Sequence, residues 1–514
     1  MHVKNNFDKT LNKEAVMKKT MFLTIAIAMS LLFLNGMAGA KSLNFALSGS
    51  PDTLDPHKTS GTLTFQTLKS VYDTLAEPDQ TGKIVPALAE KWTISDDGTT
   101  WTFSLRKGVV FHNGDKLTSR DVKATFERIK NKETGSPNAN EFAPITSMET
   151  PDDLTVVLKL AAPSAPLLGT LASGWGAILP KSLIDSGHDF ASEPVGTGPF
   201  KLTQWIRDGK LVFEKNKNYW MKGYPKLDQV IMHIIPERSV QVQGLISGQI
   251  DVSYIIDQED EPLLTSSPDV EIKKSLTSLI MVMPMNCSRP PLDDLRVRQA
   301  ITHAIDKQKV LDIAYGGGKT IGTFMDYGNA YYKDFADLYP YDPAKAKKLL
   351  AEAGVGMDTE LEMFLPQNYP PHVKAGEIYQ AMLTKVGLNV KIKLVDWSTW
   401  IGDVYRQAKF DFTAIGHTGK LDPNGTLSNF GIKEKKYVRW DNPEAAALFA
   451  KAAKIDGFEN RKKLYDQGLE LMAKEVPFMF LGSSYRRIGI RKNVSEFRMT
   501  PSLDTFDFRW TDVK

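Results

Sequence analysis

The stretch Pro86–Lys130, with the sequence PALAEKWTISDDGTTWTFSLRKGVVFHNGDKLTSRDVKATFERIK, decides the fold of this chain. Large side chains alternate with small polar ones over Trp92–Ser95 and again over Trp101–Leu105, which is the pattern of half-buried strands. The segment Asp96–Gly98 between them provides the backbone freedom that a tight turn needs. The sequence therefore predicts a β-hairpin here.

The second half of this stretch predicts a short strand, a turn and a capped helix. We expect a strand over Val109–Phe111, followed by a turn over His112–Asp115. Thr118–Asp121 has the composition of a capping box, which satisfies the free N–H groups at the start of a helix. We therefore expect a helix over Val122–Lys130.

The order of hairpin, turn and capped helix resembles a block of the family 5 extracytoplasmic solute-binding proteins, which are the receptors of peptide, nickel and related ABC importers. Three further segments, Val195–Phe200, Asn218–Trp220 and Ser247–Val252, are similar to motifs of the same family. The resemblance covers essentially the whole chain after its leader. It implies an α/β fold of the periplasmic-binding-protein type II, cluster C, with two lobes around a ligand cleft and an extra inserted domain.

The resemblance also implies how the domains follow one another. One lobe is expected to be split in the sequence and to contain the extra domain, while the other lobe is continuous. We expect a signal peptide at 1–40, lobe I at 41–85, 190–285 and 486–514, the inserted domain II at 86–189, and lobe III at 286–485.

The second half of the chain has an α/β pattern. Apolar residues at helical spacing predict a long amphipathic helical region over Asp293–Tyr315. Asp342 followed by Pro343 suits a helix N-terminus and predicts a helix over Ala344–Ala353. The segments Val390–Val395 and Phe410–Ile415 are expected to be strands.

The first forty residues have the features of a cleavable signal peptide. Met17–Lys19 is basic, Met21–Leu34 is apolar, and Ala38–Ala40 is a small-residue cleavage signal. The apolar run is shorter than the ~20 residues that span a membrane, although a single N-terminal anchor helix is the alternative. Either Met1 or Met17 can be the start. Because no cysteine follows the cleavage signal, we expect a periplasmic protein that is not a lipoprotein.

The chain without its leader is electrically neutral. Residues 1–40 contain five lysines and two acidic residues, which leaves 59 basic and 59 acidic residues in the remainder. Nucleic-acid binding needs a concentrated excess of basic residues. We therefore expect no nucleic-acid partner.

Motifs of catalysis are missing from the sequence. The histidines show no metal-ligand spacing, no Gly-x-Ser-x-Gly motif is present, and Gly316–Thr320 lacks the first glycine of a phosphate-binding loop. We therefore expect a receptor without enzymatic activity or cofactor. Its expected partners are a small-molecule ligand and an ABC permease in the inner membrane, and the family suggests a monomer. A periplasmic hydrolase or a peptide-binding chaperone on the same fold is the alternative.

The resemblance implies which residues face the ligand. Ser60, Gly61 and Thr62 stand where the family's dipeptide receptors have a cleft-lining loop, with an ordinary surface loop as the alternative. Trp397 matches an aromatic position that flanks the ligand from the second lobe, and core packing is its alternative role. Tyr369 stands close to the position of the arginine that clamps a peptide carboxylate.

The decisive segment for the ligand is Gly416–Pro423. Peptide receptors of the family resemble Gly-Trp-x-x-Asp-x-x-x-Pro here, and their aspartate pairs with the α-ammonium of the peptide. In this chain His417 stands at the tryptophan and Lys420 at the aspartate, with one residue fewer before Pro423. A shifted gap places Gly419 at the aspartate instead, and Asp422 lies close by as the alternative carboxylate. A lysine repels an ammonium group, and in a desolvated cleft that repulsion costs several kcal/mol.

Both charge anchors for a free zwitterionic dipeptide are therefore absent from their usual positions. We expect a blocked or longer peptide, a sugar conjugate, or an anionic or neutral small molecule that Lys420 binds, with a nickel chelate as a further alternative. The expected ligand-binding residues are Ser60, Gly61, Thr62, Tyr369, Trp397, Gly416, His417, Thr418, Lys420 and Asp422, and no metal site is expected.

Overall fold

The computed structural model describes residues 40–356, 358–500 and 505–514. The predicted leader segments Met17–Lys19 and Met21–Leu34 lie outside the described residues, as does most of the cleavage signal. Within the described ranges, none of the helices combines the length and the apolar character that crossing a membrane requires.

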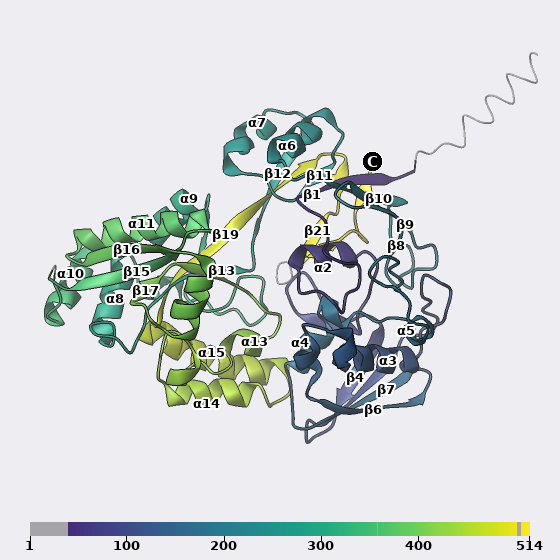
Figure 1. Cartoon of the computed structure of the whole chain (residues 1–514), viewed down its shortest axis with the longest axis horizontal. Helices are drawn as coiled ribbons and strands as arrows, with labels where there is room; N and C mark the ends of the chain where they lie inside the picture. The colour runs from purple at the N-terminus through teal and green to yellow at the C-terminus, as the bar shows by residue number, and fades with distance from the viewer. Residues whose placement is uncertain (1–39, 357, 501–504) are drawn as a thin grey trace, which may run out of the picture.

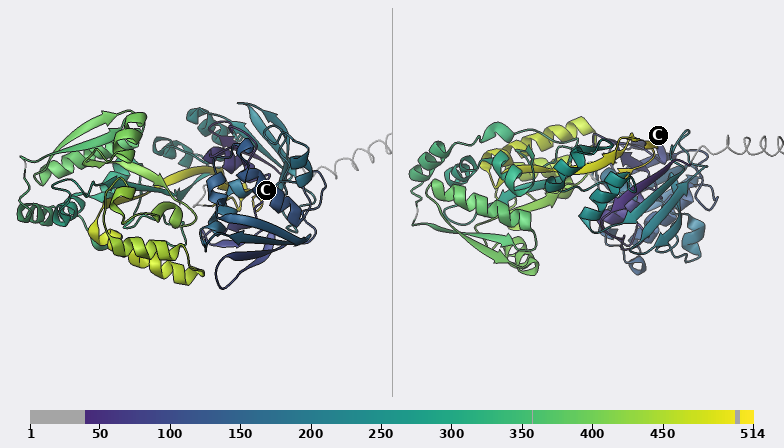
Figure 2. Two further views of the ribbon diagram at one scale, coloured as in Figure 1. Left: turned by 60° about the horizontal axis from the view of Figure 1, so that its bottom comes forward. Right: turned by 90° about the horizontal axis from the view of Figure 1, so that it is seen from above.

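A ten-stranded sheet extends through both lobes of the molecule (Figure 1, Figure 2). Its main path has the order β18, β13, β19, β11, β1, β10, β9 and β8, and β12 and β14 also pair with β19. The strands are β1 (Ser42–Leu47), β8 (Phe200–Ile206), β9 (Lys210–Lys215), β10 (Gln229–Ile234), β11 (Val252–Ser253), β12 (Val270–Leu276), β13 (Leu279–Pro284), β14 (Gly318–Thr320), β18 (Ile415–Thr418) and β19 (Phe478–Arg491).

Strand β19 belongs to both lobes. Its end from Tyr485 to Arg491 pairs with β12 in the first lobe, and its start from Phe478 to Gly482 pairs with β13 in the second. Between β12 and β13, the N–H of Thr277 donates to the carbonyl of Ser484 at 3.0 Å. The chain therefore passes between the lobes on two neighbouring strands, and β19 is visible as the long yellow strand in Figure 1.

The segment 86–189, which the sequence predicts to be the inserted domain of the first lobe, contains a four-stranded sheet with the antiparallel order β4-β5-β7-β6. The predicted hairpin is confirmed, because Ile94 pairs with Trp101 and Trp92 with Phe103. Alternate residues of one of its strands, Trp101, Phe103 and Leu105, are buried in the core of this domain. Its strands are β4 (Ala89–Ile94), β5 (Thr100–Leu105), β6 (Ile145–Asp152) and β7 (Thr155–Leu160).

Two local predictions in this domain are wrong in detail. Helix α3 spans Ser119–Lys130 and so begins before the predicted Val122, because Thr118 is itself the N-cap and the capping box encloses the first turn. The predicted strand Val109–Phe111 is an isolated bridge between Val110 and Lys116, since the tight turn leaves room for only one pair.

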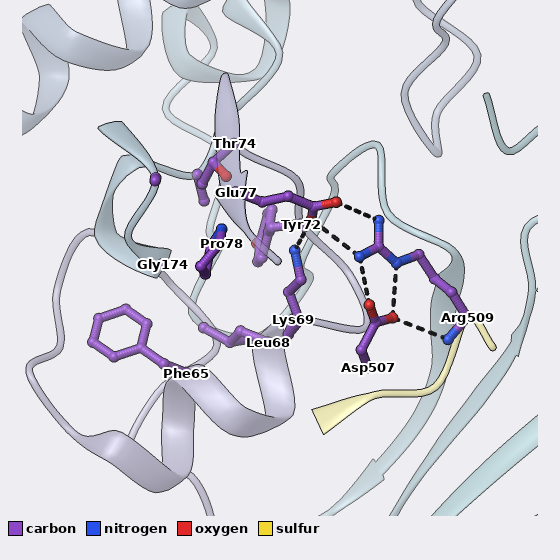
Figure 3. A pocket seen from close by; sticks show the side chains of 12 residues that line it. Phe65, Leu68, Lys69, Tyr72, Thr74, Glu77, Pro78, Gly174, Asp507 and Arg509 are labelled. Carbon is purple, nitrogen blue, oxygen red and sulfur yellow. Dashed lines mark hydrogen bonds and ion pairs between the residues drawn. The ribbon is translucent and has the colours of Figure 1, made fainter. Parts of the chain in front are cut away.

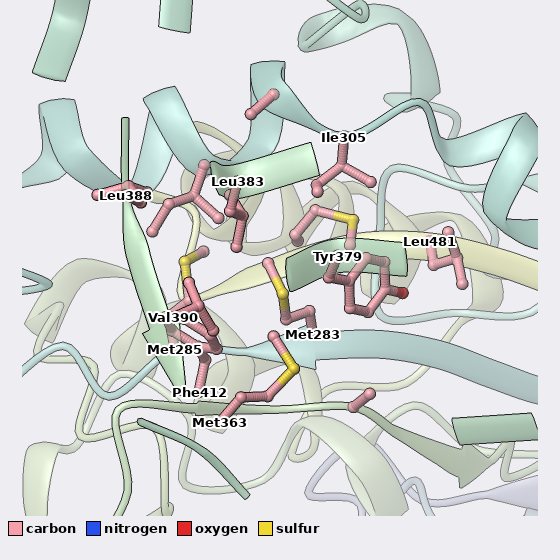
Figure 4. Close-up of a cluster of buried hydrophobic side chains, with 14 of the residues drawn as sticks. Met283, Met285, Ile305, Met363, Tyr379, Leu383, Leu388, Val390, Phe412 and Leu481 are labelled. Carbon is pink, nitrogen blue, oxygen red and sulfur yellow. The ribbon is translucent and has the colours of Figure 1, made fainter. Parts of the chain in front are cut away.

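The second lobe contains a parallel sheet with the order β16-β15-β17 and two large hydrophobic cores. Figure 4 shows one core, in which Met283 of β13, Met363 of β15, Tyr379 of α11 and Leu481 of β19 meet. On β19, Phe478 and Phe480 belong to the other core, as the alternation of a strand requires. The new elements are β15 (Glu360–Pro366), β16 (Asn389–Val395), β17 (Phe412–Thr413) and α11 (Pro370–Lys385).

Two predictions in the second lobe need correction. The expected helical region Asp293–Tyr315 consists of α8 (Leu295–Ala304) and α9 (Lys307–Ala314), because the side chain of Asp306 caps a new helix by accepting from the N–H of Lys309 at 3.1 Å. The predicted strand Phe410–Ile415 is divided between β17 and β18, which lie in different sheets. The helix expected at Ala344 is confirmed as α10 (Pro343–Glu352).

The remaining elements connect these sheets and cover their faces. The helices are α2 (Thr62–Leu68), α4 (Leu167–Leu171), α5 (Lys181–Asp185), α6 (Arg238–Ser247), α7 (Glu261–Thr265), α12 (Trp397–Thr399), α13 (Asn424–Leu427), α14 (Pro443–Ala452) and α15 (Phe458–Glu475), with a π-helix at Trp400–Arg406 and short 3₁₀ turns such as Ala139–Phe142. The short strands are β2 (Ala76–Pro78), β3 (Ile84–Pro86), β20 (Val494–Ser495), β21 (Arg498–Thr500), β22 (Thr505–Asp507) and β23 (Asp512–Val513).

The shared strand β19 leads to a first prediction about stability. A Cβ atom at Gly482 would lie 2.5 Å from the carbonyl oxygen of Lys319 and 2.7 Å from a methyl group of Leu311. Gly482→Ala is therefore expected to destabilise the protein by about 1–3 kcal/mol through overpacking, as measured by urea unfolding. Gly402→Ala is the control, because a Cβ atom at Gly402 would meet no other atom within 4 Å. Equal unfolding midpoints for the two variants would contradict the prediction.

Candidate ligand-binding cleft

A cavity of about 430 Å³ lies between the two lobes, a volume that suits a small organic ligand. Three parts of the structure line it: the first lobe with its inserted domain; the two strand segments that pass between the lobes near Thr277 and Ser484, which we call the crossing strands; and the second lobe. In that order, the lining residues are Ser60, Thr62, Phe65, Glu141, Pro166, Gly169, Thr170, Ser173, Gly174 and Trp175, then Thr277, Ser278, Leu279, Ser484 and Arg486, and finally Thr418, Gly419, Lys420, Leu421, Asp422, Asn424 and Gly425.

Buried polar contacts hold the loop that brings Ser60 and Thr62 to the cavity. Asp55, earlier in this loop, forms two hydrogen bonds with the guanidinium of Arg128 on α3, at 3.0 and 2.5 Å. The side-chain amide of Asn138 donates to the carbonyl of Thr59 at 3.0 Å. The inserted domain therefore fixes the first-lobe loop from behind.

The histidine in this loop completes the buried contact. Burial and the charge of Arg128 lower the pKa of His57 to about 4, so its ring is neutral near pH 7. The neutral ring can donate from Nε2 to the carbonyl of Ala177 at 3.0 Å and accept at Nδ1 from Arg128 at 2.8 Å. Burial alone would raise the pKa of Asp55, but the hydrogen bond and charge of Arg128 lower it below its ordinary value.

The second-lobe wall of the cavity is the segment after β18. The N–H of Gly419 donates to the carbonyl of Ser278 at 2.8 Å, which ties this segment to the crossing strands. The side-chain amide of Asn329 donates to the carbonyl of Lys420 at 2.7 Å. The backbone on both sides of Lys420 is therefore held, while its side chain is exposed.

Asp422 is engaged in a buried ion pair. Its carboxylate lies 2.7 Å from Arg461 of α15, whose side chain is 7% exposed and also donates to Tyr331 at 3.0 Å. The nearby carboxylate of Asp422 and the Tyr331 hydroxyl outweigh the effect of burial and raise the pKa of Arg461. Asp422 therefore presents little free negative charge to the cavity.

Two charged side chains of the lining remain without such partners. Within the described residues, no carboxylate pairs with the ammonium of Lys420, whose aliphatic stem lies close to Gly425. The carboxylate of Glu141, which comes from the inserted domain, likewise has no ion-pair or hydrogen-bond partner in the described part of the chain. These two groups come from opposite lobes and line the same cavity.

The structure brings only some of the predicted site residues to this cavity. Ser60, Thr62, Thr418, Lys420 and Asp422 line it, and Gly61 lies between the first two. The remaining four do not line it: Gly416, His417, Tyr369 and Trp397. Of these, His417, Tyr369 and Trp397 contact other aromatic rings of the second lobe.

His417 and Trp397 both make contacts within the second lobe. The ring of His417 lies 2.8 Å from the hydroxyl of Tyr437, and burial lowers its pKa to about 4. Trp397 stacks on Trp400 with ring centroids 5.0 Å apart, and Tyr369 meets its edge at 5.2 Å. Trp397 is 38% exposed and Tyr369 is 41% exposed, so this aromatic surface stays accessible to solvent.

Several lining residues were missed in the sequence. Phe65 and Trp175 form an edge-to-face pair with centroids 5.8 Å apart. Thr277 and Ser484 lie at the crossing strands, and Arg486 lies over the ring of Tyr254. The positions of Thr277, Ser484 and Arg486 could have been predicted, because the chain was expected to pass from one lobe to the other close to residues 285 and 486.

A small side chamber of about 40 Å³ adjoins the cleft and shares Phe65 and Gly174 with it (Figure 3). Its wall contains a charged network in which Arg509 donates to Glu77 at 2.9 and 3.1 Å and to Asp507 at 2.7 Å. Lys69 donates to Glu77 at 2.7 Å. These groups neutralise one another and join the C-terminal segment to the first lobe.

The lobes also touch beside the cavity, at the edge away from β19. The N–H of Ala165, just before α4, donates to the carbonyl of Ala453, just after α14, at 3.1 Å. A Cβ atom on Gly169 would lie 3.1 Å from Cβ of Asp422, so the chains approach closely here. Figure 1 shows α4 and α14 facing each other at this edge. The cavity is therefore bounded by both lobes and by their connection.

Comparison with known proteins places the chain in a family. The sequence model described as bacterial extracellular solute-binding proteins, family 5 Middle, matches residues 83–438. The chain belongs to this family. It is 28% identical to the glutathione-binding protein GsiB of Salmonella paratyphi A over 487 residues, which cover 92% of this chain and 95% of that protein.

Two further relatives extend the comparison. The di/tripeptide-binding protein 1 of Pseudomonas aeruginosa is 30% identical over 499 residues, covering 90% of this chain and 93% of that protein. The structure of HbpA2 from Haemophilus parasuis superposes with a TM-score of 0.84 at 27% identity, covering 92% of this chain and all of that one.

These comparisons confirm the family and the α/β periplasmic-binding-protein fold that the sequence predicts. The relatives are solute-binding proteins and not enzymes. Proteins of family 5 are typically periplasmic, bind a ligand and work with an ABC permease.

The buried loop contact leads to a second prediction. Arg128→Met would leave the carboxylate of Asp55 buried without its partner, which costs about 3–5 kcal/mol. Arg120→Met is a matched control on the same helix, because the side chains of Arg120 and Asp153 are 61% and 68% exposed and such a pair contributes about 0–1 kcal/mol. Thermal and urea unfolding of the two variants would measure the difference. A similar loss in both would contradict the prediction.

Proposed function

We propose that this protein is the receptor of an ABC importer that captures a small, peptide-like solute between its lobes and delivers it to a membrane permease. The observation that carries the proposal is the cavity of about 430 Å³ lined by both lobes and by the strands that join them. A ligand in this position contacts both lobes at once. Its binding energy therefore depends on how closely the lobes approach.

The mechanism that follows is physical rather than chemical. A ligand that binds the closed arrangement more tightly than the open one shifts the population toward closure by that difference in affinity. Two crossing strands suit a hinge, because small changes of backbone angle near Thr277 and Ser484 move one lobe relative to the other. The closed protein would then present the surface that the permease recognises.

The names of the relatives support a peptide-like solute. GsiB is named a glutathione-binding protein, and the Pseudomonas relative a di/tripeptide-binding protein. By the resemblance to peptide receptors, Lys420 stands at the position of the aspartate that binds the peptide ammonium, and Asp422 is held by Arg461. We infer that a free dipeptide in the family's usual orientation is disfavoured.

The role of the protein in the cell completes the proposal. We infer that it acts without catalysis, as a monomer in the periplasm, after removal of the signal peptide predicted at 1–40 and without a lipid anchor. The groups proposed to face the ligand are Ser60, Gly61, Thr62, Thr418 and Lys420. The domain boundaries predicted from the sequence stay a prediction.

Mass spectrometry of the solute that co-purifies with the protein would test this function. We expect native spectra to show one small molecule per chain, released by denaturation, and calorimetry of the refolded protein with that molecule to give one site. Thr170→Trp is expected to weaken binding at least tenfold, because its side chain would fill part of the cavity. Lys435→Trp, outside the lining, serves as the control. A protein that binds neither a co-purified solute nor any peptide would contradict the proposal.

A further inference from the structure

The charges of the cleft are arranged with a definite polarity. The second lobe contributes a cation, Lys420, whose ammonium pairs with no carboxylate among the described residues. The inserted domain contributes an anion, Glu141, from the 3₁₀ turn Ala139–Phe142. Both side chains are exposed, and each can therefore reorient toward a ligand.

The second acidic group of the second-lobe wall does not change this polarity. Asp422 has both carboxylate oxygens on Arg461, at 2.7 and 2.9 Å, and one oxygen also accepts from the N–H of Asn424 at 2.9 Å. An amino group that approached Asp422 would compete with a guanidinium that is 7% exposed and already in place. Breaking such a buried pair is costly. The second lobe is therefore positive toward the ligand.

The first-lobe side offers neutral hydrogen-bonding groups around its single acid. The hydroxyl groups of Ser60, Thr62 and Thr170 line the cavity, together with the ring of Trp175. None of these carries a charge, so the orientation of a charged ligand is set by Glu141 on this side and by Lys420 on the other. Arg486 at the crossing strands adds a second cationic group to the lining.

We propose that the ligand carries an acidic group that binds Lys420 of the second lobe and an amino group that faces Glu141 of the inserted domain. This inference rests on the proposed receptor function and names the chemistry of its ligand. The polarity is the reverse of the one in which a second-lobe aspartate holds the amino group. Because closure removes water from both contacts, each charge pair becomes stronger in the closed state than in the open one.

This polarity makes Lys420 a specificity-determining residue. An ammonium bound by charge-assisted hydrogen bonds to a carboxylate contributes more than a neutral contact. A ligand with an amide in place of the acid would leave the lysine desolvated without a partner. The cleft should therefore distinguish an acid from its amide, although the two molecules have nearly the same shape.

The test compares each probe with its own blocked forms. The tripeptides Ala-Ala-Ala and Gly-Gly-Gly, each as the free acid, as the C-terminal amide and as the N-acetyl derivative, are titrated into the protein by calorimetry after refolding removes any retained solute. We expect at least one free acid to bind at least tenfold more tightly than its amide. Lys420→Met should bring the acid-to-amide ratio close to one, while Lys435→Met, a lysine outside the lining, should leave it unchanged.

The acidic partner is tested in the same way. Glu141→Gln should reduce the preference for a free amino group over its N-acetyl form and leave the acid-to-amide ratio intact. Equal binding of acid and amide by the unaltered protein would overturn the inference but leave the receptor function standing. If no probe binds in any form, the inference that the ligand is a peptide of this polarity is contradicted. The receptor function is then tested separately by the co-purified solute.

Discussion

The structure depends on one strand that two lobes share. β19 gives its first half to the sheet of the second lobe and its second half to that of the first, and its side chains enter three separate cores. The neighbouring segment of the same chain also passes from one lobe to the other, at Thr277 between β12 and β13. Backbone hydrogen bonds therefore join the lobes at these strands, and a second contact, from the N–H of Ala165 to the carbonyl of Ala453, lies at the opposite edge of the cavity.

This constraint explains the position of the cavity. Thr277 and Ser484, where the chain passes between the lobes, line the cavity together with residues of the two lobes. Rigid anchors keep each wall in shape. On one side Asp55 and Arg128 fix the loop of Ser60, and on the other Asp422 and Arg461 fix the segment of Lys420. The buried charges of the site are thus structural, and the exposed ones remain for the ligand.

Much of the fold could be predicted because its signals are local. The hairpin at Asp96–Gly98 and the capping box at Thr118 act over a few residues, and the family motifs extend that information to the whole chain. The apolar spacing of the sequence continues from α8 into α9, so it does not show the break between the two helices. The break arises because the side chain of Asp306 caps the start of α9. The segment Val109–Phe111 does carry a strand pattern, but the pattern does not show that pairing stops at the single bridge between Val110 and Lys116.

The site was predictable only where it follows a motif. Lys420 lines the cavity, and it could be predicted to do so because the sequence around it resembles a motif of the family. The pairing of Asp422 with Arg461 joins residues 39 positions apart, and Glu141 lies in a turn without any motif, so neither was visible. Trp397 is partly exposed and stacks on Trp400 at the start of a π-helix, and the sequence carries no pattern that predicts this π-helix.

Small-angle X-ray scattering of the purified protein, with its ligand and after the ligand has been removed, tests the central claim most directly. If two lobes close on a solute about the crossing strands, the radius of gyration falls on ligand addition and the pair-distance distribution loses its longest distances. Identical profiles in both states, at a ligand concentration that saturates the site, would contradict the account.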